Sequence, residues 1–336
     1  MRRRLFRRVP LAAMVGGLLM LCGGFVPHRA RAQGRLADQA ALFLLLPVSA
    51  RAVGFGHAMT AASGSGEGVW WNPAGIASVK RGDASLHHSQ SVIGTSEAIT
   101  VSAGTSLLGV LALSANVLDF GGEIPAVDNQ GNVVGKILPR NLAVVGTYAT
   151  QIGRRFRTGV SYKIVQFRFD CEGLCPSIPT KQASTTALDL GVQFDLPTKV
   201  PVSIGASLRN LGVRLQINDS PQSDPLPTRL QIGALAHYRI PKAYANDAEV
   251  RFALDVIDEL PVGRPLPRMG GEFVWEKRAF LRAGYVFESD DAESGGPTLG
   301  LGFVAGRLVI DFARVFTGLS ADAGQAPTYI SLRVGF

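Results

Sequence analysis

Two adjacent histidines followed by a serine are residue types that could catalyse hydrolysis. His87, His88 and Ser89 are adjacent and would supply the base and the nucleophile that hydrolases use. A hydrolase also needs an orienting acid brought to the base in space, and the sequence shows no such constellation. Histidines on a strand usually serve only as polar residues. We therefore predict that the protein is not an enzyme.

Cofactor and metal motifs are also missing from the sequence. The run Gly54-Phe55-Gly56 is too short for a phosphate loop and lacks the strand-to-helix context that such a loop requires. Neither EF-hand nor zinc spacing occurs anywhere in the chain. We predict no metal and no cofactor.

Two cysteines, Cys171 and Cys175, stand in the run C-E-G-L-C. Three interpretations are open: two free thiols in a loop, two zinc ligands, or a disulfide. A zinc site needs two more ligands, and none is close in sequence. If the chain is exported, the oxidising compartment favours a disulfide, and Gly173 helps a small ring to close. We expect the disulfide.

The N-terminal residues have the pattern of a secretory signal peptide. Five arginines lie within residues 2–8, and residues 11–26 are uncharged and apolar. Ala30-Arg31-Ala32 then supplies small residues before a cleavage site at Gln33. The alternatives are a retained signal anchor and a lipoprotein lipidated on Cys22. We expect cleavage, which makes residues 1–32 a signal peptide.

The positive charge of the chain belongs mostly to this signal. The net charge is +8, and residues 1–32 contain seven arginines and no acids, which leaves 8 − 7 = +1 for the remainder. That balance gives no support for nucleic-acid binding. No later segment has 18 uninterrupted apolar residues, yet the mean hydropathy is +0.19. The apolar residues must therefore follow another pattern.

That pattern is alternation with a period of two, which is typical of strands with one apolar face. It is clear at the C-terminal end, where residues 329–336 alternate and finish on an aromatic residue. The apolar face of this segment consists of Ile330, Leu332, Val334 and Phe336. A terminal aromatic of this kind resembles the signal read by the barrel assembly machinery of the outer membrane, which we expect as a partner beside outer-membrane lipids.

Alternating strands would also suit a soluble sandwich, but three features favour a membrane barrel. Charges and glycines occupy the polar face, the strands approach the ~9–11 residues of a tilted membrane strand, and the chain ends inside its last strand. An open sheet edge is not tolerated in lipid, so the sheet must close. We predict an all-β fold, an antiparallel transmembrane barrel of about fourteen strands, in the outer membrane of a Gram-negative bacterium. The predicted strands are 83–91, 96–105, 107–118, 141–150, 155–165, 184–195, 201–210, 227–240, 248–258, 267–276, 279–288, 296–304, 307–315 and 328–336.

The same alternation predicts which polar residues face the lumen. Their mixed signs suggest cross-strand ion pairs that fill and stiffen it. The charged members are Asp189, Arg209, Arg251, Asp255, Glu272, Arg282, Asp311 and Arg333, with Gln231 beside them. The breaks in alternation at Ile164-Val165 and Asn210-Leu211 mark either a bulge or the point where a strand leaves the membrane. Short turns are assigned to the periplasmic side and long loops, including residues 241–247, to the outside.

The segment before the first strand carries a family resemblance. Residues 45–58 read L-L-P-V-x-A-R-x-x-G-x-G-x-A, and residues 71–75 read W-N-P-A-G. With shorter matches in the strands, such as Arg282-Ala283-Gly284-Tyr285, the chain resembles the PorV/PorQ barrels. These are similar to the FadL long-chain fatty-acid transporters.

The resemblance implies a fourteen-stranded barrel whose N-terminal segment, residues 33–82, folds into the lumen as a hatch, with residues 83–336 as the barrel. The residues expected to shape the hatch are Gly54, Gly56, Trp70, Trp71, Asn72, Pro73 and Gly75. The two tryptophans either wedge the hatch against the wall or lie at the membrane interface.

Two functions follow from the resemblance. PorV-like proteins belong to type IX secretion, which implies secretion-system proteins and secreted cargo as partners. The alternative is a FadL-like uptake channel for hydrophobic small molecules, which needs an apolar pocket. The inward charges speak mildly against such a pocket, and we expect the secretion role.

Overall fold

The computed structural model divides the chain into residues 1–35 and a second unit, Leu36–Phe336. The residues described are 39–91, 93–105, 108–122, 124–128, 130–175, 181–216, 223–243, 247–259, 265–287, 295–316 and 326–336. The predicted signal peptide lies outside them.

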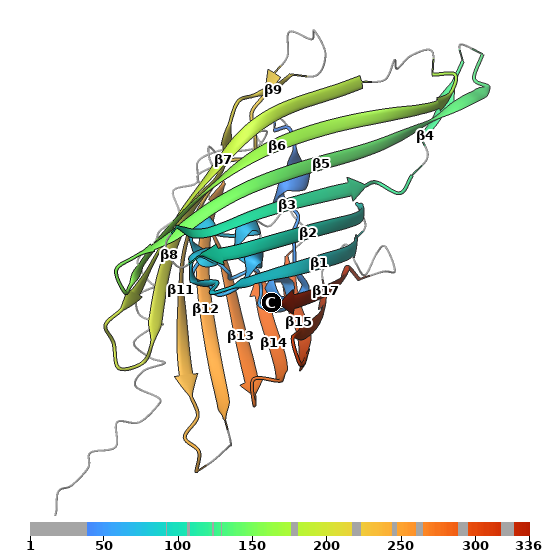
Figure 1. Ribbon diagram of the computed structural model, residues 1–336. Helices are drawn as coiled ribbons and strands as arrows, with labels where there is room; N and C mark the ends of the chain where they lie inside the picture. Colours follow the sequence, from blue (N-terminus) through green and yellow to red (C-terminus); the bar gives the residue numbers. More distant parts are fainter. Residues whose placement is uncertain are drawn as a thin grey trace, which may run out of the picture. The chain divides into compact units, whose positions relative to one another are not determined.

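The second unit is a closed antiparallel β-barrel. Its main sheet has fifteen strands in the order β3-β2-β1-β17-β16-β15-β14-β13-β12-β11-β8-β7-β6-β5-β4. Because β3 also pairs with β5, fourteen strands close the ring and β4 lies beside it. Figure 1 shows β17, the last strand, next to β1, the first. The prediction of a fourteen-stranded antiparallel barrel is therefore confirmed.

The strands of the ring agree with the predicted segments at most boundaries. They are β1 (Gly82–Ser91), β2 (Gly94–Thr105), β3 (Gly109–Asp119), β5 (Val133–Ile152), β6 (Phe156–Gly173), β7 (Lys181–Leu196), β8 (Val202–Gly212), β11 (Arg229–Arg239), β12 (Ala248–Glu259), β13 (Pro265–Trp275), β14 (Ala279–Val286), β15 (Gly296–Ala305), β16 (Leu308–Val315) and β17 (Thr328–Gly335). Three short strands lie outside the ring: β4 (Ile124–Val127) pairs with β5, and β9 (Leu215–Gln216) pairs with β10 (Ser223–Asp224).

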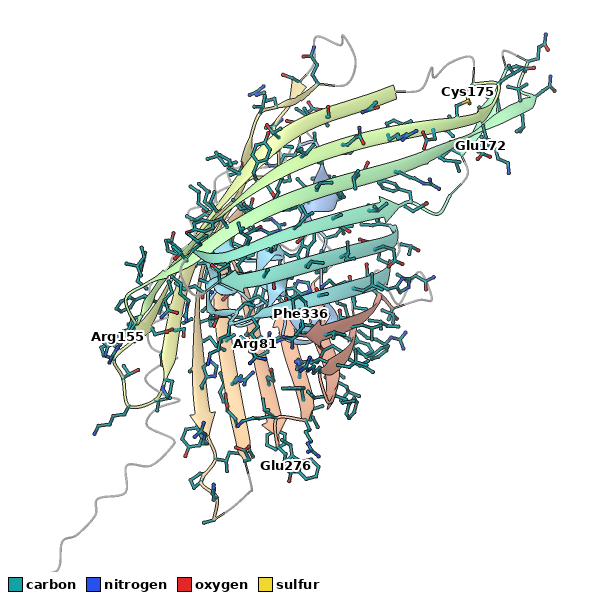
Figure 2. All side chains as sticks on the ribbon, in the orientation of Figure 1. Arg81, Arg155, Glu172, Cys175, Glu276 and Phe336 are labelled. Atoms are coloured by element: carbon teal, nitrogen blue, oxygen red, sulfur yellow. A yellow bond between two sulfur atoms is a disulfide. The ribbon has the colours of Figure 1, made fainter. Side chains whose placement is uncertain are left out.

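Two strands are much longer than predicted. β5 has 20 residues and β6 has 18, against 11 in β3. Their added residues continue past the ends of β1–β3, and β4 lies along the extension (Figure 1). Figure 2 places Glu172 and Cys175 at this end and Arg155 and Glu276 at the opposite end.

One loop assignment was wrong. Residues 241–247 were expected on the outer side because they form a long connection, but they join β11 to β12 at the end of the barrel that carries the tight turns. Antiparallel strands alternate in direction, so strand order fixes the side of a connection and loop length does not.

The two breaks in alternation have different outcomes. Around Asn210 the pairs are Leu190 with Leu208 and Leu188 with Leu211, so β8 carries one extra residue. The extra residue makes this a β-bulge, which was one of the two expected alternatives. Asn210 in the bulge has φ +57°. At Ile164-Val165 the pairing with β5 and β7 continues without a shift. Ile164 is exposed and Val165 is fully buried, so the alternation is kept there.

The outer surface of the ring is apolar, as lipid contact requires. Leu113 on β3 is 64% exposed and Phe252 on β12 is 61% exposed. Near the tight turns the exposed side chains include the aromatic Trp275 and Phe303, which flank Ala279 of β14 in the register. Aromatic girdles of this kind mark the edges of the apolar band in membrane barrels.

The residues before β1 form short helical pieces. These are η2 (Leu42–Leu45), α2 (Ala50–Gly54), η3 (Gly66–Trp70) and η4 (Pro73–Ser78). We call residues 39–81 the N-terminal segment. Among the described residues, none of the helices has the length and apolarity needed to cross a membrane.

Candidate functional site

The N-terminal segment contacts the inner faces of strands from all parts of the ring. The Ala50 amide donates to Ser331 Oγ of β17 at 2.8 Å, and the Thr60 amide to Asp255 Oδ2 of β12 at 2.8 Å. On the opposite wall, Gln193 Nε2 of β7 donates to the Ala62 carbonyl at 2.9 Å. A segment that bonds to β17, β12 and β7 lies within the ring.

Glycines on the wall let the backbone of the segment approach closely. A Cβ on Gly284 of β14 would lie 2.3 Å from the amide nitrogen of Gly56, and one on Gly270 of β13 would lie 2.2 Å from the Phe55 carbonyl oxygen. Such distances are far inside van der Waals contact, so a larger residue would force the backbones apart. The segment supplies glycines as well, because a Cβ on Gly54 would lie 2.8 Å from Gly300 Cα and Gly56 has φ +62°.

The W-N-P-A-G run turns the segment and fastens it to the wall. Asn72 Oδ1 caps η4 by accepting from the Ala74 amide at 3.0 Å, and Pro73 occupies the first turn. Asn72 Nδ2 donates to the Thr60 carbonyl at 2.7 Å. A Cβ on Gly75 would lie 2.6 Å from the Ala62 carbonyl oxygen, so only glycine fits beside that turn.

Both tryptophans of the run are inside the ring. Each is 6% exposed. Trp70 Nε1 donates to Thr100 Oγ1 of β2 at 3.0 Å, and Trp71 Nε1 donates to the Val48 carbonyl at 3.1 Å. Of the two expectations for these residues, the structure places them against the wall and not at the membrane interface.

Several of the predicted inward charges meet in one network on β12–β16. Arg282 Nη1 lies 2.6 Å from Asp311 Oδ1, and Arg282 Nε lies 3.6 Å from Glu272 Oε2. Arg251 Nη1 is 3.4 Å from Glu272 Oε1. Arg333 on β17 lies 3.9 Å from Asp83. These pairs cross between strands, as mixed signs on one face suggested.

Sequence reasoning missed the charges that the N-terminal segment adds to this network. Glu67 is fully buried, accepts from Ser49 Oγ at 2.9 Å and lies 3.5 Å from Arg51 Nη1. Burial by itself would raise the pKa of Glu67, but Arg333, Arg51 and His87 outweigh burial and lower that pKa from 4.5 to about 2. The segment has no periodicity, so no pattern indicated that Glu67 and Arg51 point inward.

A second group of charges lies on β6–β8. Lys163 Nζ is 2.7 Å from Asp189 Oδ2 and donates to Asn210 Oδ1 at 2.7 Å. The bulge turns the Asn210 amide inward, where it donates to Asp189 Oδ1 at 2.8 Å. Arg209 Nε lies 3.9 Å from Asp189 Oδ2. Lys163 was also missed, although it occupies an inward position of its alternating strand.

A small cavity of about 20 Å³ adjoins this second group. Its walls come from η2 and the residues after it, from η3 and from the inner faces of β3, β5, β6 and β8. The residues that line it are Phe43, Leu44, Leu46, Val48, Trp70, Asn116, Ala143, Val145, Lys163 and Arg209. It is therefore apolar with two cations at one side.

The histidines noted in the sequence do not meet in one site. His87 is buried, with Nδ1 2.8 Å from Ser331 Oγ and Nε2 3.0 Å from Ser85 Oγ. His88 projects to the other face of β1 and pairs with Glu97 at 2.5 Å. Adjacent strand residues point to opposite faces, so these two side chains serve different surroundings. That the protein is not an enzyme stays a prediction.

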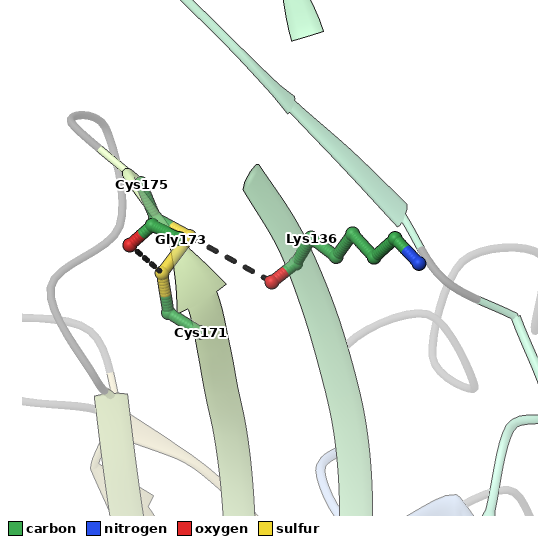
Figure 3. The surroundings of a disulfide bond; sticks show 4 residues. All are labelled: Lys136, Cys171, Gly173 and Cys175. Carbon is green, nitrogen blue, oxygen red and sulfur yellow. Dashed lines mark hydrogen bonds between the residues drawn. A yellow bond between two sulfur atoms is a disulfide. The ribbon is translucent and has the colours of Figure 1, made fainter. Parts of the chain in front are cut away.

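Cys171 and Cys175 form a disulfide at the end of β6, with their Cα atoms 6.3 Å apart (Figure 3). Their sulfur atoms contact the Gly173 and Lys136 carbonyl oxygens at 3.8 and 3.7 Å. The residues of the expected assembly signal, Ile330, Leu332, Val334 and Phe336, are 39–52% exposed on the outer face of the ring. The Phe336 amide donates to the Gly82 carbonyl at 3.1 Å, which joins the last residue to the first strand.

Comparisons with known proteins identify the fold. No family profile and no curated protein matches the sequence. Among solved structures, the toluene transporter TbuX of Ralstonia pickettii has a TM-score of 0.54 at 13% identity, over 85% of this chain and 97% of that one. The CymD monoaromatic hydrocarbon channel gives 0.53 at 14%, over 87% and 98%. A FadL homologue of Pseudomonas aeruginosa gives 0.51 at 10%, over 86% and 98%. At these identities the likeness shows the fold alone: this chain has the fold of the FadL-type outer-membrane barrels.

Proposed function

We propose that this protein is an outer-membrane channel for hydrophobic small molecules in a Gram-negative bacterium. The observation that carries the proposal is the shared fold, which spans 97–98% of the length of the toluene transporter and the monoaromatic hydrocarbon channel. The apolar outer surface suits a membrane location.

The N-terminal segment is the proposed hatch. It carries hydrogen bonds to β17, β12 and β7, and its side chains Trp70 and Val53 are buried. A hatch of this kind would close the lumen to bulk water. The intact protein is therefore expected to pass no ions in a planar bilayer, and deletion of residues 39–78 to open an ion-conducting pore.

This hatch experiment has a built-in folding check. Folded barrels resist unfolding in cold detergent and migrate differently in gels before and after heating, so the deleted form is scored only if it shows that shift. Steady conductance from the intact protein would contradict the hatch.

The secretion role that the PorV/PorQ resemblance implies stays a prediction. The structurally similar toluene transporter and monoaromatic hydrocarbon channel favour the alternative, a channel for hydrophobic small molecules. Partners such as secretion-system proteins and secreted cargo, and the barrel assembly machinery acting through the last strand, likewise stay predictions.

One experiment separates the two functions. The tagged protein is purified from its native outer membrane in a gentle detergent, and mass spectrometry identifies the proteins and small molecules that come with it. A lone barrel with a bound apolar molecule supports the channel. Recovery of a large translocon, or of secreted proteins that share a C-terminal domain, in stoichiometric amounts would overturn it.

A further inference from the structure

Cations gather in the tight turns at one end of the barrel. The turns β5–β6, β7–β8, β13–β14 and β15–β16 hold six of them and a single carboxylate, Glu276. We call these six residues the basic belt: Arg154, Arg155, Lys199, Lys277, Arg278 and Arg307. Figure 2 shows Arg155 and Glu276 at this end, opposite Glu172 and Cys175. Short turns mark the periplasmic side of a bacterial barrel, so a barrel in the outer membrane places the belt at the inner leaflet.

The cations of the belt are open to solvent. All six side chains are exposed. Within the described part of the chain, only Lys277 of the six forms an ion pair, at 3.6 Å from Asp247, and its side chain is still 74% exposed. The outward-facing Arg140 at the opposite end, by contrast, lies 3.1 Å from Asp119. The positive charge of the belt is therefore available to a partner from outside the chain.

The belt lies directly beside the lipid-facing side chains. Ile152, which is 58% exposed, comes two residues before Arg154, and Trp275, which is 55% exposed, comes two residues before Lys277. A strand rises about 3.3 Å per residue, so these cations lie within about 7 Å of the apolar band. Turns this short cannot carry their side chains far from the bilayer surface, where phospholipid headgroups lie.

The belt also runs around the wall. In the sheet, β6 and β13 are five strand steps apart, with β7 and β8 between them and β15 and β16 beyond. A soluble acidic protein would contact one sector of this circumference, whereas lipids surround a barrel on all sides. The distribution of the cations therefore favours headgroups over a protein partner.

We propose that the basic belt binds anionic phospholipid headgroups, such as that of phosphatidylglycerol, at each of these turns. Basic residues at a membrane surface attract anionic lipids, and arginine donates paired hydrogen bonds to phosphate. The apolar stems of the side chains lie along the wall while the charged ends reach the headgroups. The inference goes beyond the channel function, because it needs only that the barrel lies in a bilayer.

Trp275 is a natural reporter for the belt. The chain has three tryptophans, and Trp70 and Trp71 are each 6% exposed inside the ring, whereas Trp275 faces outward. The purified protein is inserted into vesicles of phosphatidylcholine that contain increasing amounts of phosphatidylglycerol, with dibrominated chains on one lipid or the other. Bromine quenches tryptophan only at short range, so the loss of fluorescence measures which lipid lies beside Trp275.

The test variant combines Lys277→Gln with Arg278→Gln, which removes the two cations nearest to the reporter. The matched control combines Arg154→Gln with Arg155→Gln, which removes the same charge from a turn five strand steps away. Five steps correspond to about 24 Å along the wall, beyond the screening length of about 8 Å at physiological salt. Heat-dependent gel migration checks that each variant is folded.

We expect phosphatidylglycerol to be preferred about fivefold over phosphatidylcholine beside Trp275 in the wild type. The preference should fall as sodium chloride is raised, because salt screens exposed charges. The variant at Lys277 and Arg278 should lose most of the preference, and the control should keep it.

Equal quenching by the two lipids in the wild type would overturn the inference without any variant. An unchanged preference in the folded variant at Lys277 and Arg278, or an equal loss in the control, would overturn it as well. In these cases the channel function stands, because toluene uptake does not depend on the headgroup. Quenching by neither lipid would show that Trp275 does not face lipid, which removes the membrane barrel and with it the channel.

Discussion

The amide and the hydroxyl of Thr60 donate to the same oxygen, Oδ2 of Asp255, at 2.8 and 2.6 Å. The contact joins the N-terminal segment to β12 and is completely buried. Gly233 lies opposite Asp255 in the register, and a Cβ there would lie 1.8 Å from Asp255 Oδ1. The geometry of this carboxylate therefore depends on a glycine on β11.

Replacing Thr60 by valine removes the hydroxyl and keeps the shape of the side chain. A hydrogen bond to a charged group contributes about 1.5–3 kcal/mol, so we expect Thr60→Val to destabilise the segment by about that amount. Thr60→Ser keeps the hydroxyl and is the control, with a smaller effect. The measurement is urea unfolding in detergent, followed by tryptophan fluorescence. Equal stability of Thr60→Val and the wild type would show that this bond does not hold the segment.

The close approach at Gly284 gives a second prediction. A methyl group there would lie 2.3 Å from the Gly56 amide nitrogen, and overpacking of this kind costs about 1–3 kcal/mol. We expect Gly284→Ala to loosen the segment and speed tryptic cleavage after Arg51. Gly146→Ala is the control, because no atom lies within 4 Å of its Cβ position. The idea fails if both variants resist trypsin as the wild type does.

Glu67 makes the segment sensitive to acid. The pKa of Glu67 is lowered from 4.5 to about 2. The contribution of the ionised carboxylate to the stability of the N-terminal segment is therefore fully present above pH 4.5, and it is lost as the pH falls from about 4.5 to about 2. A shift of this size corresponds to about 3 kcal/mol. We expect the segment to loosen across this range, as shown by the fluorescence of Trp70 and Trp71.

Glu67→Gln is the matched variant for this titration. It removes the charge but keeps the shape of the side chain. The loss of stability of the N-terminal segment between pH 4.5 and about 2 should therefore become smaller. If the two proteins respond to acid in parallel, Glu67 is not the titrating group.

The disulfide should be dispensable for the barrel. It joins two cysteines only four positions apart in the sequence, at the end of β6 and away from the N-terminal segment. We expect mass spectrometry to find that an alkylating agent modifies neither cysteine in the unreduced protein. Cys171→Ser combined with Cys175→Ser should change barrel stability by less than about 0.5 kcal/mol. Unfolding of the barrel on reduction would contradict this.

The barrel could be predicted from the sequence because the alternation of apolar and polar residues is a property of each strand by itself. Alternation over residues 184–195 or 307–315 defines a strand and its inward face without knowledge of its partners. The extension of β5 was missed because Gly135 and Pro139 interrupt the pattern at residues 133–140, where pairing with β6 carries the strand onward.

The interior was predicted less well because its contacts are not local. Asp255 was expected among the inward charges, but the sequence did not show that it accepts from Thr60, 195 residues away in the chain. Arg209 lies 3.9 Å from Asp189 across the strands, as mixed signs suggested, but the sequence did not show that Lys163 lies nearer to that carboxylate, at 2.7 Å. Alternation shows that a side chain faces inward, whereas its partner depends on how the segment is folded.

Uptake of a hydrophobic solute by whole cells tests the proposed channel function. Cells that lack the protein and cells that produce it receive labelled toluene, with a labelled disaccharide as the polar control. We expect the protein to raise the rate of toluene entry in a saturable way and to leave entry of the disaccharide unchanged. No change in toluene entry, or an equal rise for both solutes, would contradict a selective channel for hydrophobic small molecules.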